Sequence, residues 1–119
     1  NHSNFILWNP TTETKKITKV ASQIDVLPTL LNLFGINYDS RMIVGKDILS
    51  NSEGLAIFSN RSWVTDKGKY YARTSTFVPN EGVTISNDYV ANMNINVANK
   101  FSISSLLLEN NYYKAILNE

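Results

Sequence analysis

The chain has 119 residues, 43% of them hydrophobic, and its 11 basic and 10 acidic residues give a formal net charge of +1. A chain of this length can bury one hydrophobic core, so one compact unit is expected. The near-zero net charge lacks the basic surplus of proteins that neutralise many phosphates, which argues against nucleic acid as a partner. The absence of cysteine excludes disulfides, thiolate metal sites and a thiol nucleophile.

The chain opens almost directly with the apolar run at residues 5–8, which Asn9-Pro10 closes. Such a run before a proline is typical of a buried strand followed by a turn. Residues 11–19 are polar and fit a solvated connection or an edge strand. Because the chain lacks an initiator Met, a signal peptide and an apolar run of membrane-spanning length, we interpret it as a soluble piece of a longer protein.

The clearest helix signal covers residues 26–34. Apolar side chains recur at helical spacing, at Leu27, Leu30, Leu31 and Phe34. Asp25 is placed to cap the helix, Pro28 falls in its first turn, and Gly35 is placed to end it. The leucine face is expected to pack on a sheet.

Three β-rich runs follow, at residues 54–58, 62–65 and 69–73, and polar turn segments separate them. This spacing predicts an antiparallel meander with one buried face. Residues 74–86 are predicted to form a loop because of Pro79 and Gly82. Two helices are then expected, at residues 87–99 and 101–117, with Ser102 or Ser104 capping the second.

Few residues are candidates for a catalytic, metal-binding or ligand-binding role. The only histidine, His2, is a weak substrate-binding candidate, because a solvated terminal histidine without a role is the simpler interpretation. The carboxylates are scattered singly, so no metal site is predicted. Arg61, Lys69 and Arg73 belong to a basic-aromatic cluster that could contact a phosphorylated headgroup or an anionic lipid surface, although such clusters are more often solvated faces.

Several segments together resemble one enzyme superfamily. The apolar run at residues 5–8, a spacer, and the pattern I-D-x-x-P-T-L-L-x-x-x-G at residues 24–35 resemble the late part of the sulfatase and alkaline phosphatase superfamily. Residues 45–50, 56–65 and 110–113 look more narrowly like lipoteichoic acid synthases and membrane phosphoglycerol transferases. The resemblance spans most of the chain.

The resemblance implies a bacterial, membrane-anchored parent enzyme with an extracellular catalytic domain. Such an enzyme moves glycerol phosphate from phosphatidylglycerol through a phospho-threonine intermediate, with a divalent metal, Mn²⁺ or Mg²⁺, held by acidic residues and a histidine. The family's nucleophile and its Asp-His metal pair lie upstream of this piece, so no catalytic or metal residue is expected in it. Thr29 matches the helix motif and not the motif of the nucleophile.

The expected fold is α/β in the parent and α+β in the isolated piece. Residues 1–50 would end the sulfatase-like α/β domain, and residues 51–119 would form an antiparallel meander and C-terminal helical subdomain. The upstream part of the same polypeptide is the implied partner. An unpaired first strand also predicts a homodimer or a domain swap of the isolated piece.

Two further functions stay open at this stage. The parent could be a sulfatase-family hydrolase instead of a transferase. Alternatively, the chain could be a stand-alone binding module for an anionic lipid headgroup or a cell-wall polymer, in which case binding would weaken with salt and would need Arg61, Lys69 or Arg73.

Overall fold

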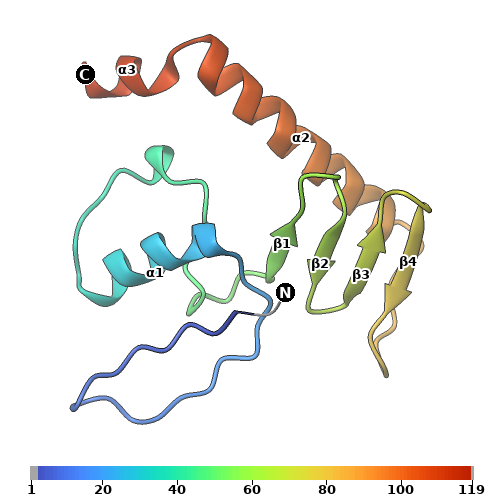
Figure 1. The fold of residues 1–119 in the computed structure, drawn as a ribbon, viewed down its shortest axis with the longest axis horizontal. Coiled ribbons are helices and arrows are strands. Elements are labelled where there is room, and N and C mark those ends of the chain that lie inside the picture. Colours follow the sequence, from blue (N-terminus) through green and yellow to red (C-terminus); the bar gives the residue numbers. More distant parts are fainter. Residues whose placement is uncertain (1–2, 119) are drawn as a thin grey trace.

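The structure, a computed structural model, describes residues 3–118 and has an open outline of 44 × 41 × 25 Å (Figure 1). The elements follow the order η1 (Gln23–Asp25), α1 (Val26–Leu33), η2 (Ser40–Met42), β1 (Leu55–Ile57), β2 (Trp63–Thr65), β3 (Gly68–Tyr71), β4 (Thr76–Pro79), α2 (Tyr89–Glu109) and α3 (Tyr112–Leu117). An antiparallel sheet and separate helices make this an α+β fold, as the sequence predicts for the isolated chain.

The four strands form one meander in the order β1-β2-β3-β4, with each strand antiparallel to the next. The predicted meander is therefore confirmed, but it has one strand more than expected. Residues 76–79 were predicted to lie in a loop, and they form β4 instead. Pro79 is tolerated because it is the last residue of an edge strand.

The core lies between one face of this sheet and α2. The register places Trp63 opposite Tyr70, and Tyr70 opposite Phe77, so three aromatic side chains cross the sheet in a row. The Trp63 ring stacks on Tyr70 with centroids 5.4 Å apart and lies 5.6 Å from Phe77. Met93 and Val97, one helical turn apart on α2, complete the buried cluster around Trp63.

The indole of Trp63 is fully buried and keeps its polar group paired. Its Nε1–H donates to Asn94 Oδ1 at 2.9 Å, so the buried ring leaves no donor unsatisfied. This bond comes from α2 and fixes the helix against β2. Beyond the sheet, the last turns of α2 and then α3 project away from the core (Figure 1).

The predicted helix at residues 26–34 is confirmed as α1, and it ends as expected at Gly35, which has φ of 66°. Gly35 N–H donates to Asn32 O and Ile36 N–H to Leu31 O, the pattern of a Schellman motif. The expected packing of its leucine face on the sheet is wrong, because Leu27 and Phe34 are more than half exposed. In Figure 1, α1 lies beside the β1 edge and not on the sheet face.

Two other predictions need correction. Residues 5–8 form no strand, and their side chains are 52%, 84%, 48% and 80% exposed. They belong to a long excursion without helix or strand that leads to α1, seen in blue in Figure 1. They pair with no strand of the described chain, which leaves their apolar surface uncovered.

The predicted break between the last two helices is also misplaced. α2 runs unbroken through residues 100–104, and the break comes at Asn110 and Asn111, where Asn111 has φ of 51°. Ser102 Oγ and Ser104 Oγ donate to the carbonyls four residues earlier, at 3.1 and 3.0 Å. Their hydroxyls are thus satisfied inside the helix, and neither serine acts as a cap.

Candidate functional site

Two networks of polar residues contribute to the lining of one cleft beside β1. The first network joins α1 to the loop that follows η2. The second joins the β2–β3 turn to α2 and to the segment entering α1. Both consist mainly of side chains that hold backbone N–H groups, so their first effect is to fix loop positions.

Asp25 is the centre of the first network. It was predicted to cap α1, but its side chain makes no hydrogen bond to the first turn of that helix. Instead Oδ2 accepts from Ser22 N–H and Oδ1 from Lys46 N–H, each at 2.8 Å. The buried carboxylate therefore ties the start of η1 to a loop 21 residues later in the chain.

Thr29 extends this contact by one helical turn. Its buried hydroxyl donates to Asp25 O at 2.6 Å and accepts from Ile48 N–H at 2.9 Å. Asp25 and Thr29 together hold two alternate backbone N–H groups of one segment, those of Lys46 and Ile48. We call this arrangement the Asp25–Thr29 latch.

Gly45 makes the latch possible. A Cβ atom at this position would lie 1.9 Å from Ile24 O, a distance that real Cβ atoms do not show. Only glycine lets the chain pass this close to the start of the helix. The D-x-x-P-T motif and the later Gly-Lys-Asp motif thus form one structural unit.

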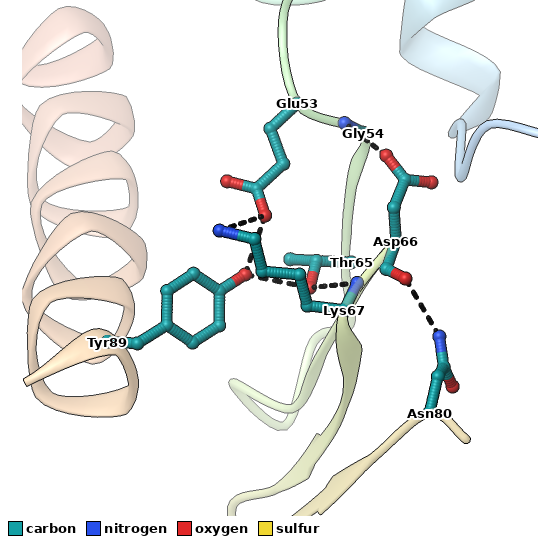
Figure 2. A network of polar contacts seen from close by, with 7 residues as sticks. All are labelled: Glu53, Gly54, Thr65, Asp66, Lys67, Asn80 and Tyr89. Carbon is teal, nitrogen blue, oxygen red and sulfur yellow. Dashed lines mark hydrogen bonds and ion pairs between the residues drawn. The ribbon is translucent and has the colours of Figure 1, made fainter. Parts of the chain in front are cut away.

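The second network contains Asp66 in the turn between β2 and β3 (Figure 2). Asp66 Oδ1 accepts from Val20 N–H at 2.7 Å, and Oδ2 accepts from Gly54 N–H at 3.0 Å. On the other side of the turn, Asn80 Nδ2 donates to Asp66 O at 2.9 Å. Asp66 therefore fixes the segment entering α1 and the start of β1 to the same end of the sheet.

Tyr89, at the start of α2, belongs to the same network. Its hydroxyl donates to Glu53 Oε1 at 2.7 Å and therefore accepts the hydroxyl proton of Thr65 at 2.9 Å. Lys67 Nζ lies 3.7 Å from Glu53 Oε1 and 4.5 Å from the Tyr89 ring centroid (Figure 2). Burial of the phenol, together with its bond to Glu53, raises the pKa of Tyr89 to about 12, against the smaller lowering effect of Thr65.

Outside both networks, one surface pair in η2 has a shifted carboxyl. Arg41 donates side-chain and backbone hydrogen bonds to Asp39, and these bonds lower the pKa of that carboxyl. Arg41 is exposed and Asp39 is partly exposed, so this surface pair contributes little to stability.

The cleft beside β1 has a volume of about 240 Å³. One wall comes from the latch and its loop, including Ile24, Lys46 and Ile48. The apolar floor comes from β1 and from α2, including Leu55 and Phe101. Its lining is mainly apolar, with lysines from three separate segments.

Of the predicted binding residues, Arg61, Lys69 and Arg73 do not line this cleft. Arg61 and Arg73 lie in the two turns at the same end of the sheet, which are linked by a bond from Ala72 N–H to Ser62 Oγ at 3.0 Å. Arg61 lies over the Phe101 ring, 5.7 Å from its centroid. Lys69 alternates with the core-facing Tyr70 along β3 and is exposed, which places it on the opposite face of the sheet. His2 lies outside the described residues.

Sequence reasoning missed Lys19, Lys46 and Lys100 as neighbours of one cleft. They stand far apart in the sequence, and no spacing rule joins them. Among residues 3–118, no three His, Cys, Asp or Glu side chains are grouped so as to hold a metal ion. In the same range, no helix is both long and apolar enough to cross a membrane.

Most of this chain is similar to part of a known enzyme. The chain is 30% identical over 100 residues to Lipoteichoic acid synthase 2 of Bacillus subtilis (strain 168). The match covers 78% of this chain but only 15% of that protein's length. No family model matches the chain, and no solved structure matches it at a significant level. Most of this chain is therefore similar to a small part of a lipoteichoic acid synthase.

Proposed function

We propose that this chain is the C-terminal part of an extracytoplasmic, metal-dependent phosphoglycerol transferase of the lipoteichoic acid synthase kind. The similarity to Lipoteichoic acid synthase 2 carries the proposal. The threonine nucleophile and the ligands of Mn²⁺ or Mg²⁺ belong to the upstream part of the same polypeptide. Phosphatidylglycerol is the donor lipid, and the parent is membrane-anchored with its catalytic domain outside the cell.

In this proposal the chain completes the fold of the parent enzyme and contributes no catalytic residue. The apolar run at residues 5–8 adds a strand to the large sheet of the upstream domain. Its exposure supports this role, because four large side chains left in water forgo the free energy of burial. The Asp25–Thr29 latch and Asp66 then fix the C-terminal sheet relative to that domain.

The test is a phosphatidylglycerol turnover assay on the parent protein and on the 119-residue chain, each with and without added Mn²⁺ or Mg²⁺. We expect metal-dependent release of diacylglycerol by the parent and none by the chain. A parallel assay with an aryl sulfate separates the transferase from a sulfatase-family hydrolase, which would cleave the sulfate ester and leave the lipid intact. Turnover by the isolated chain would contradict the proposal.

A second candidate function is a binding module for an anionic lipid headgroup or wall polymer. It is favoured by the exposure of all three predicted cations, Arg61, Lys69 and Arg73. The chain would then bind phosphatidylglycerol vesicles in sedimentation, more weakly as salt rises, and an Arg61→Gln/Arg73→Gln variant would lose that binding. Equal binding to neutral phosphatidylcholine vesicles would eliminate this function.

A further inference from the structure

The cleft beside β1 combines an apolar floor with lysines that have no carboxylate partner in the described chain. Its floor is formed by Leu55 and Ile57 of β1 and by Phe101 of α2, all three of which also pack against the core. The floor is therefore supported by the sheet and does not depend on loop conformation. Lys19, Lys46 and Lys100 approach it from three different segments.

The lysines have no carboxylate partner within residues 3–118. Lys19 Nζ donates to Ser50 O at 2.7 Å, which orients the ammonium group but leaves its charge unneutralised. Lys46 and Lys100 form no side-chain hydrogen bond or ion pair in the described chain. An ammonium group has three N–H donors, so both lysines have their full capacity available for a ligand.

The acidic groups of the cleft are already engaged. Asp25 accepts hydrogen bonds from the backbone N–H groups of Ser22 and Lys46. Asp47 accepts from Leu49 N–H at 2.8 Å and from Asn32 Nδ2 at 3.1 Å. Glu53 accepts from Tyr89 and pairs with Lys67. Protein donors thus hold these three carboxylates in place, whereas the ammonium groups of Lys46 and Lys100 have no protein acceptor within residues 3–118.

The size of the cleft limits the ligand. Its volume of about 240 Å³ lies below the roughly 300–1,000 Å³ of pockets for drug-sized molecules, so only a small ligand, or a small part of one, fits inside it. An apolar floor with free cations matches a molecule that has a short alkyl part and one anionic group.

We propose that this cleft is a binding site for a small amphiphilic anion, a short alkyl carboxylate or alkyl phosphate. The alkyl part lies on Leu55, Ile57 and Phe101, and the anionic group is held by Lys46 and Lys100. The inference does not rest on the proposed function, because it concerns binding by the 119-residue chain and needs no turnover.

The experiment is an amide chemical-shift titration of the ¹⁵N-labelled 119-residue chain with hexanoate, butyl phosphate, inorganic phosphate and hexanol. We expect saturable shifts at the cleft walls with hexanoate or butyl phosphate, and the tighter of the two identifies the anionic group. Inorganic phosphate and hexanol should each bind more weakly, because phosphate lacks the alkyl part and hexanol lacks the anionic group. Equal affinity for hexanol, or shifts scattered over the surface, would overturn the proposal.

Two variants make the test specific. Lys46→Gln/Lys100→Gln should weaken binding on the order of tenfold or more, since it removes two charge-assisted contacts. Lys15→Gln/Lys16→Gln is the matched control, because it removes the same two charges from an exposed segment that does not line the cleft, and it should leave the affinity unchanged. Unchanged affinity in the double variant, with a native-like spectrum, would overturn the assignment.

Discussion

Asp25 and Thr29 lie one helical turn apart and hold alternate backbone N–H groups of a single segment, at 2.8 Å to Lys46 and 2.9 Å to Ile48. A threonine and an aspartate at this spacing suggest a catalytic pair with Thr29 as the nucleophile. Both side chains are buried, and the Thr29 hydroxyl already donates to Asp25 O. The pair therefore positions the loop, which explains the motif without giving Thr29 a role as nucleophile.

The first prediction concerns the Thr29 hydroxyl. Thr29→Val keeps the shape of the side chain but removes both bonds and leaves the partly buried Ile48 N–H without its acceptor, at a cost of about 2 kcal/mol in the free energy of unfolding. Thr29→Ser keeps the hydroxyl and should cost about 1 kcal/mol for its lost methyl group. Urea unfolding measures both values, and hydrogen exchange at Ile48 should accelerate only in the valine variant. Equal exchange rates in the two variants would show that the hydroxyl does not hold this loop.

The second prediction concerns the close approach at Gly45. Gly45→Ala should lower the free energy of unfolding by more than about 2 kcal/mol, because the new Cβ would collide with Ile24 O. Gly82→Ala is the control: Gly82 has φ of 73° and open space around it, so alanine there costs only about 1 kcal/mol of backbone strain. Thermal and urea denaturation of both variants decide the order of stability. If Gly82→Ala is the more damaging change, the loop does not pass as close to η1 as the latch requires.

The third prediction follows from the raised pKa of Tyr89, about 12. The folded state favours the neutral phenol, so its stabilising contribution is complete below the ordinary tyrosine pKa of about 10 and is lost as pH rises toward 12. Subtracting the ultraviolet titration of Tyr89→Phe from that of the native chain isolates this single phenol and should give a midpoint near pH 12. Circular dichroism over the same range reports whether the fold persists. A midpoint near 10 in a chain that is still folded would mean that the Tyr89 phenol is not buried between Thr65 and Glu53 as the structure places it.

The elements predicted correctly are those that local chemistry specifies. The helix at residues 26–34 has Pro28 in its first turn and Gly35 at its end, and tight turn residues separate the strands of the meander. The misses involve competing local and tertiary effects. Pro79 indicated a loop, but Phe77 packs against Trp63 in the aromatic row, and this contact stabilises β4. Ser104 indicated a cap, but its hydroxyl bonds back within α2.

The cleft and the second network could not have been predicted from the sequence. Asp66 fits the hairpin turn that was predicted for it, and nothing local shows that its carboxylate binds Val20 and Gly54. Lys19, Lys46 and Lys100 line one cleft only because the segment entering α1 is fixed beside β1. Both features depend on contacts between residues far apart in the chain, which spacing rules do not capture.

The last prediction concerns the exposed apolar run at residues 5–8. In the isolated chain, an extended apolar segment without a strand partner favours pairing with a second copy, so we predict a homodimer or a domain swap. Ile6→Lys/Trp8→Lys should shift the chain toward monomer in sedimentation velocity, because it places two charges in the contact. Leu108→Lys is the control, since it alters a side chain of similar exposure, 77% against 84% and 80%, on the projecting end of α2. A concentration-independent monomer before any substitution would contradict this prediction, and a loss of dimer with Leu108→Lys alone would move the contact to α2.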